Sequence, residues 1–140
     1  MNIFFDVDYT LIGGMDRAPR PLVKEVLERL KGDGHDIYIW SGVGLRWKEV
    51  NQLEIAHVVR DCFVKPMSNY YQAMKAMNLP AEPEIVVDDF PVVASAFGGI
   101  SIPAYNFENP DDRVMERVYE VISEYSSTGH SADPIFRTKK

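Results

Sequence analysis

Five short apolar runs alternate with amphipathic stretches along this chain, and no other feature of the sequence restricts its fold as strongly. The runs occupy residues 3–7, 36–40, 62–64, 84–87 and 100–104. Apolar residues at helical spacing follow them, at residues 21–30, 45–56, 70–77, 92–97 and 111–125. Strands that are apolar along their whole length are buried on both faces, and a helix between successive strands favours parallel pairing. The alternation therefore predicts a mainly parallel, five-stranded sheet with helices on both faces.

The size and composition of the chain fit one globular domain. Its 140 residues suffice for a single core, and 46% of them are hydrophobic, which argues against general disorder. We expect residues 1–125 to form this core and the polar residues 126–140 to form a flexible tail. The 15 basic and 21 acidic residues give a net charge of −6. This charge disfavours binding to nucleic acid or to a membrane through overall attraction.

A single cysteine, Cys62, limits the redox and metal chemistry open to the chain. One thiol excludes an internal disulfide and any zinc site built from several cysteines, and it favours a reducing compartment. No apolar run approaches the ~20 residues that a membrane-spanning helix needs. The N-terminus also lacks the basic and then apolar pattern of a signal peptide. We therefore expect a cytoplasmic protein.

Polar side chains follow four of the predicted strands at the point where each strand ends. They are Asp6, Asp8 and Thr10 after the first strand, Ser41 after the second, Lys65 after the third, and Asp88 and Asp89 after the fourth. Parallel sheets bind ligands beyond the carboxyl ends of their strands, so we expect these side chains to face one crevice. Each residue by itself is common at a turn or on a surface, but four strand ends together predict a site.

The chemistry of this set favours a divalent cation and a phosphate. Four carboxylates in one crevice repel one another unless a cation lies between them. A set of oxygen donors without histidine or cysteine suits Mg²⁺ rather than zinc. Lys65 can bind a phosphate oxygen by its charge, and Ser41 can bind one by its hydroxyl. One carboxylate can attack phosphorus to form an aspartyl-phosphate, while a second, two residues away, transfers protons.

The same residues resemble the four motifs of the haloacid dehalogenase superfamily. The segment Asp6-Val7-Asp8-Tyr9-Thr10-Leu11 is similar to the Asp-x-Asp-x-Thr pattern of motif I, and Trp40-Ser41-Gly42 is similar to motif II. Lys65 resembles the lysine of motif III, and Val86-Val87-Asp88-Asp89 resembles the paired-aspartate form of motif IV. These motifs follow the family's order over residues 3–104. The resemblance implies a Rossmann-like three-layer α/β/α sandwich.

The resemblance also implies catalytic roles for the residues of the first motif. Asp6 would be the nucleophile and a metal ligand. Asp8 would be the general acid and base, with its backbone carbonyl on Mg²⁺, and it marks phosphoryl transfer rather than dehalogenation. Thr10 would support the geometry of the loop. Tyr9 departs from the pattern, because many phosphatases of this family have glycine there.

The other motifs imply binding roles. Ser41 and Gly42 would bind the transferring phosphoryl group, and Lys65 would neutralise charge on the phosphate and the nucleophile. Asp89 is expected as the direct metal ligand of the fourth motif, with Asp88 supporting it or binding through water. The sequence does not separate the roles of these two aspartates.

The spacing between the motifs leaves no room for a cap domain. Residues 12–39 and residues 66–87 are each used up by one helix and the adjoining strand ends. A capless member has an open site, which implies a large substrate or a partner subunit that covers it and excludes water. Gly13-Gly14-Met15 is a candidate flap. Arg46 and Trp47 remain open candidates for a contact with the leaving group.

These observations predict a Mg²⁺-dependent phosphomonoester hydrolase, a phosphatase that acts through an aspartyl-phosphate. The alternative is a regulatory module on the same fold that binds phosphate or a nucleotide with little turnover. A phosphoacceptor domain like a bacterial receiver is disfavoured, because its acceptor aspartate follows the third strand, where this chain has Lys65. The expected partner is a phosphorylated small molecule or macromolecule. The substrate and a homo-oligomeric state stay open.

Overall fold

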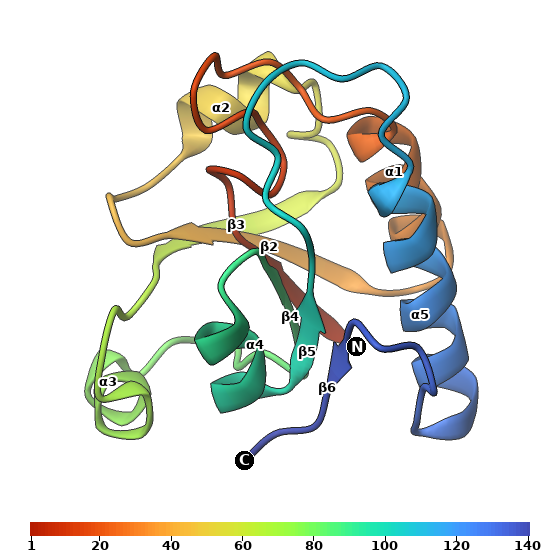
Figure 1. Cartoon of the computed structure of the whole chain (residues 1–140). Coiled ribbons are helices and arrows are strands. Elements are labelled where there is room, and N and C mark those ends of the chain that lie inside the picture. Colours follow the sequence, from red (N-terminus) through yellow and green to blue (C-terminus); the bar gives the residue numbers. More distant parts are fainter.

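The computed structural model describes all 140 residues and contains a six-stranded sheet in the order β3-β2-β1-β4-β5-β6 (Figure 1). The strands are β1 (Asn2–Phe5), β2 (Asp36–Ser41), β3 (Val59–Val64), β4 (Ile85–Asp88), β5 (Gly99–Ser101) and β6 (Phe136–Arg137). Strands β1 to β5 pair in parallel, whereas β6 pairs antiparallel to β5. The predicted α/β class with a mainly parallel sheet is therefore confirmed.

The prediction of five strands is wrong, because residues 126–140, which we expected to form a tail, add a sixth strand. In β6, Arg137 pairs with Gly99, and Phe136 pairs with Ile100. The residue before β6, Ile135, is buried in the core. A strand of two residues shows neither an apolar run nor a regular alternation, so the sequence pattern could not indicate it.

Helices lie on both faces of the sheet. They are α1 (Val23–Gly32), α2 (Trp47–Gln52), α3 (Tyr70–Met77), α4 (Pro91–Phe97) and α5 (Val114–Thr128). Successive side chains of a strand point to opposite faces. In β1, Ile3 and Phe5 therefore join an apolar cluster with α1 and α5, whereas Phe4 joins a second cluster with α4. Figure 1 shows α1 and α5 together on one side, and α3 and α4 on the other. Every helix falls short of the length and apolar character that crossing a membrane requires.

The order of the strands determines where a site can form. From β1 the chain passes outward to β2 and β3, and it then returns to the other side of β1 as β4. This reversal places the carboxyl ends of four parallel strands side by side, in the order β3-β2-β1-β4. Ligands of open α/β sheets bind in the crevice outside such a reversal point.

Candidate active site

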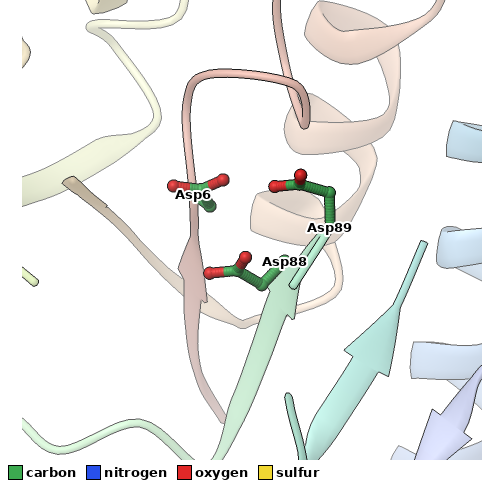
Figure 2. Close-up of side chains that lie close together, drawn as sticks. All are labelled: Asp6, Asp88 and Asp89. Atoms are coloured by element: carbon green, nitrogen blue, oxygen red, sulfur yellow. The ribbon is translucent and has the colours of Figure 1, made fainter. Parts of the chain in front are cut away.

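Three aspartates gather at the ends of β1 and β4. Asp6 directly follows β1, Asp88 is the last residue of β4, and Asp89 comes next. Each offers one carboxylate oxygen within 4.8 Å of the oxygens of the other two. Figure 2 shows the three carboxylates around one small space beyond the strand ends. Asp6 and Asp88 are buried, and Asp89 is half-buried. The structure thus brings together the predicted nucleophile and both aspartates of the fourth strand.

Lys65 reaches this cluster from the end of β3. Its backbone N–H donates to the Ser41 carbonyl at 2.9 Å and so continues the pairing of β3 with β2. Its side-chain Nζ donates to Asp6 Oδ1 at 3.0 Å and to Asp88 Oδ2 at 2.8 Å. Burial opposes the charge of this ammonium, but the two carboxylates outweigh burial and raise the pKa of Lys65 above its ordinary value. Lys65 is therefore a buried cation in direct contact with the predicted nucleophile.

The cluster has more negative charge than its lysine balances. Burial raises the pKa of Asp88, and the nearby Asp6 carboxylate raises it further. Burial also raises the pKa of Asp89 to about 7, and the nearby Asp6 and Asp88 carboxylates raise it further. A divalent cation would relieve this repulsion, and carboxylate oxygens are ligands that Mg²⁺ prefers. The chemistry of these donors therefore fits a hard cation.

Hydrogen bonds distinguish the two neighbouring aspartates. Asp88 accepts a hydrogen bond from Lys65 through Oδ2 and one from the Phe90 N–H through Oδ1, at 2.9 Å. Asp89 accepts one long contact, from the Thr10 hydroxyl at 3.4 Å. Both oxygens of Asp88 already have protein donors, so Asp89 offers the freer oxygens to a cation.

Thr10 contacts the predicted nucleophile directly. Its hydroxyl donates to Asp6 Oδ2 at 3.0 Å, and the residue is fully buried. The Thr10 carbonyl in turn accepts a hydrogen bond from Arg20 Nη1 at 3.2 Å. Arg20 is itself buried and pairs with Asp112 at 3.0 Å. We did not predict this role for Arg20, because arginine is usually exposed and the sequence around it resembles no motif.

The Asp8 carboxylate lies outside the group formed by the three aspartates and pairs with Arg46 instead. Its Oδ2 and Oδ1 accept hydrogen bonds from Arg46 Nη1 at 2.7 Å and from Arg46 Nη2 at 2.9 Å. The chain turns directly after Val7, whose carbonyl accepts the N–H groups of Thr10 and Leu11. The side chain of Asp8 therefore faces the loop after β2 instead of β4. Its hydrogen bonds to Arg46 hold the pKa of Asp8 below its ordinary value.

Ser41 ends β2 on the same side as Asp8. It is buried, and its Oγ accepts hydrogen bonds from Arg46 Nη1 at 3.0 Å and from the Val43 N–H at 3.3 Å. Gly42 follows, and a Cβ atom at this position would collide with the sulfur of Met67. The small residues of this segment thus let the loops after β2 and β3 approach each other. The predicted phosphate-binding residues lie at adjacent strand ends, as the motif order implies.

Tyr9 adopts a backbone conformation that glycine reaches more easily than a residue with a side chain. Its φ of 64° lies in the left-handed region, which costs a residue with a Cβ atom roughly 1–2 kcal/mol. The Tyr9 ring packs on Gly14, where a Cβ atom would collide with it. The Gly14 N–H also donates to the Tyr105 carbonyl at 2.9 Å. The expected flap is therefore in contact with Tyr9 and with the loop after β5.

Two charged residues behind Arg46 were not predicted at all. Glu49 of α2 accepts from Arg46 Nε at 2.7 Å through Oε1 and from Arg17 Nη2 at 3.0 Å through Oε2. Burial opposes ionisation of Glu49, but Arg46 outweighs this effect and lowers the pKa of Glu49. The spacing of three residues between Arg46 and Glu49 was the available signal, because residues three apart on a helix are neighbours.

Neither a protein-family model nor a curated protein matches this chain. The chemical interpretation of the site therefore rests on its own residues. A buried carboxylate in contact with an ammonium and a hydroxyl can act as a nucleophile toward an electrophile that carries negative charge. The neighbouring carboxylates can hold the cation that such an electrophile needs.

Proposed function

We propose that this protein is a Mg²⁺-dependent phosphomonoester hydrolase, a capless phosphatase of the haloacid dehalogenase type on a Rossmann-like three-layer sandwich. One observation supports this function most strongly. Asp6, at the end of the central strand β1, contacts Lys65 and Thr10, and it lies against the two aspartates at the end of β4. A nucleophile, a cation for the phosphate and a set of metal ligands would therefore lie together at the carboxyl ends of these strands.

Asp6 would begin the reaction. One of its carboxylate oxygens attacks phosphorus, and the bond between phosphorus and the ester oxygen breaks. The leaving oxygen takes a proton from the Asp8 carboxyl group when that group is protonated, or departs as the anion when it is an aryl oxygen. Lys65 and Thr10 hold the Asp6 carboxylate in place, at 3.0 Å each. Lys65 also offsets the negative charge that the phosphoryl group brings. Water then attacks the phosphorus of the aspartyl-phosphate, which releases inorganic phosphate and restores Asp6.

Asp8 would transfer protons in both steps. In the substrate-free site it is ionised and paired with Arg46, which is the form that accepts a proton from the attacking water. Ser41, together with Gly42, would bind the phosphoryl oxygens. Bound Mg²⁺ would neutralise phosphate charge. Its ligands would be the carboxylates of Asp6 and Asp89 and the backbone carbonyl of Asp8, with Asp88 in a supporting position.

The connections between the strands support the absence of a cap. Between β1 and β2 the chain forms α1 alone, and between β3 and β4 it forms α3 alone. Large apolar side chains are exposed in the loops that follow the site strands; they are Met15, Val43, Leu45, Met67 and Phe90. An open site bordered by apolar side chains suits a large phosphorylated substrate that covers the site itself. A small phosphorylated substrate would need a partner subunit to cover the site.

Turnover of an aryl phosphate tests this function. An aryl leaving group needs little protonation, so the paired state of Asp8 does not limit the first step. We expect hydrolysis with Mg²⁺, none with EDTA, and a loss of at least about 10³-fold in kcat for Asp6→Asn. Asp111→Asn, at an exposed carboxylate outside the site, is the matched control and should retain full activity. Metal-dependent turnover that survives Asp6→Asn would refute the mechanism.

The second candidate, a regulatory module with little turnover, is favoured by one contact. Both oxygens of Asp8 are occupied by Arg46, which leaves the proposed acid without a proton for a poor leaving group. The aryl phosphate assay separates the phosphatase from the regulatory module when the binding of inorganic phosphate is measured in addition to turnover. Binding of inorganic phosphate with Mg²⁺, without hydrolysis of any phosphomonoester in a broad panel, would favour the regulatory module.

A further inference from the structure

We propose that Arg46 is a positioning residue of this site, which orients the Ser41 hydroxyl and the Asp8 carboxylate together; the inference rests on the proposed phosphatase function. Arg46 lies in the loop between β2 and α2 and is 6% exposed. No other residue contacts both Asp8 and Ser41 through side-chain hydrogen bonds. The predicted proton-transfer residue and the predicted phosphate-binding residue are therefore coupled through one guanidinium.

The guanidinium uses nearly all its hydrogen-bonding capacity on protein groups. It has five N–H donors in a rigid planar fork. Nη1 donates to Asp8 Oδ2 and to Ser41 Oγ, Nη2 donates to Asp8 Oδ1, and Nε donates to Glu49 Oε1. These contacts are between 2.7 and 3.0 Å long. Arg46 is thus fixed among three side chains, which suits a positioning role better than direct capture of a substrate.

The contacts of Ser41 show what Arg46 achieves there. A hydroxyl has one O–H donor and two acceptor lone pairs. Arg46 Nη1 and the Val43 N–H both donate to Ser41 Oγ, so both lone pairs are engaged. The remaining capacity of Ser41 is its O–H donor, which is the group that an anionic phosphoryl oxygen requires. Without Arg46, the hydroxyl could accept from other donors and turn its proton away from the phosphate.

Glu49 and Arg17 hold Arg46 from behind. Glu49 is buried and accepts from Arg46 on one oxygen and from Arg17 on the other. Arg17 is mostly exposed, with 57% of its side chain accessible. Charges alternate in sign along this row, from Arg17 at the surface to Asp8 at the site. The row keeps a buried arginine fully paired, which a buried charge needs in order to be tolerated.

Lysine cannot replace Arg46 in this position. An ammonium is a point charge on a flexible stem, whereas the guanidinium matches a carboxylate with two parallel hydrogen bonds and still reaches a third partner. Arg46→Lys therefore keeps the charge and loses the orientation. A small guanidinium ion in solution, by contrast, can occupy the space left by Arg46→Ala and restore the same contacts.

Steady-state hydrolysis of an aryl phosphate with Mg²⁺ tests the inference. We expect a fall of about 10²-fold in kcat/KM for Arg46→Ala, as for a displaced catalytic group, and a similar fall for Arg46→Lys. Glu49→Gln should lower kcat/KM less, since it keeps an acceptor for Arg46 Nε. Arg113→Ala removes a 66% exposed side chain whose ion pair to Glu116 is 3.8 Å long, and it is the control with unchanged activity.

Rescue separates positioning from mere support of the fold. Millimolar guanidinium should raise the activity of Arg46→Ala at least about tenfold. Methylammonium at the same concentration should not, because only the planar guanidinium reproduces the contacts of Arg46. The inhibition constant of inorganic phosphate should rise in Arg46→Ala and fall again with guanidinium, because Ser41 regains its orientation.

The outcomes distinguish this inference from the function on which it rests. Wild-type protein without Mg²⁺-dependent turnover would overturn both. Active wild type with full activity in Arg46→Lys would overturn the positioning role alone. If Arg46→Ala fails to fold, Arg46→Lys and Glu49→Gln still decide the question, because each keeps the polar or charged group that pairs in the interior. Folded Arg46→Ala that is inactive and is not restored by guanidinium would also count against the proposal.

Discussion

Replacing Lys65 by methionine tests the electrostatics of the site without any assumption about its substrate. Lys65 is the cation that contacts Asp6 and Asp88, at 3.0 and 2.8 Å, and the three side chains are 8%, 8% and 1% exposed. At this depth, water does little to screen the carboxylates that lose their partner. Breaking a buried ion pair by removing one member costs roughly 3–5 kcal/mol. Methionine keeps most of the volume of the lysine stem, so a cavity adds little to this loss.

The expected loss lies at the lower end of that range and depends on pH. Burial already raises the pKa of Asp88 and Asp89, and removing the ammonium raises the pKa of Asp88 further, because Lys65 lowers it in the wild type. A carboxyl group whose pKa is higher in the folded than in the unfolded state binds more protons when folded, so it lowers stability as the pH rises. We therefore expect a loss of about 3 kcal/mol at pH 8 and a smaller loss at pH 5.

Urea unfolding in EDTA, followed by circular dichroism, measures this loss. The slope of the unfolding free energy against urea should stay unchanged, because the folded state buries the same surface. The exposed Lys48→Met is the control and should stay within about 0.5 kcal/mol of wild type. Excess Mg²⁺ should restore part of the stability of Lys65→Met, since it supplies positive charge to the same carboxylates. A loss below about 1 kcal/mol at pH 8 would refute the buried, charged cluster.

Three further predictions concern the backbone, a histidine and the metal. Gly99→Ala should destabilise the protein by about 1–3 kcal/mol in urea unfolding, because its Cβ atom would collide with the Val86 carbonyl. Gly32→Ala, with open space around it, should stabilise by about 0.4–1 kcal/mol, and equal effects would contradict this packing. Burial, and then the N-terminal ammonium, lowers the pKa of His35, so the unfolded state binds more protons below about pH 6.5 and stability falls as the pH drops. His35→Gln should make the unfolding free energy depend less on pH between 7 and 5, and an unchanged slope would contradict this. Mg²⁺ should raise the Tm of wild type but not of Asp89→Asn; an equal shift in both would remove Asp89 from the metal site.

The alternating pattern of strands and helices was predictable, because it depends on where apolar residues fall along the sequence. A strand buried on both faces must be apolar along its length, and residues 3–5 and 85–87 show this directly. Strand β6 could not be predicted, since its two residues are held by pairing with β5 and by the buried Ile135 rather than by a pattern of their own.

The residues of the site were predictable as a set, but their pairing was not. Parallel strands of one sheet end at the same edge, so Asp6, Lys65 and Asp88 were expected to face one crevice. The contacts of Asp8 depend instead on the turn after β1 and on the loop that presents Arg46. Arg20 was difficult to recognise for a physical reason. Buried arginines are rare, and the partner of Arg20, Asp112, lies 92 residues away in the sequence.

The covalent intermediate tests the central claim most directly. Asp8→Asn removes the group that accepts a proton from the attacking water, so this variant should accumulate the aspartyl-phosphate when it reacts with an aryl phosphate and Mg²⁺. Rapid quenching and mass spectrometry of the digested protein should then locate one phosphoryl group on Asp6. The double variant Asp6→Asn with Asp8→Asn should show none. A phosphoryl group on another residue would contradict the proposed mechanism. So would turnover by the wild type when neither the wild type nor Asp8→Asn contains any phosphorylated enzyme.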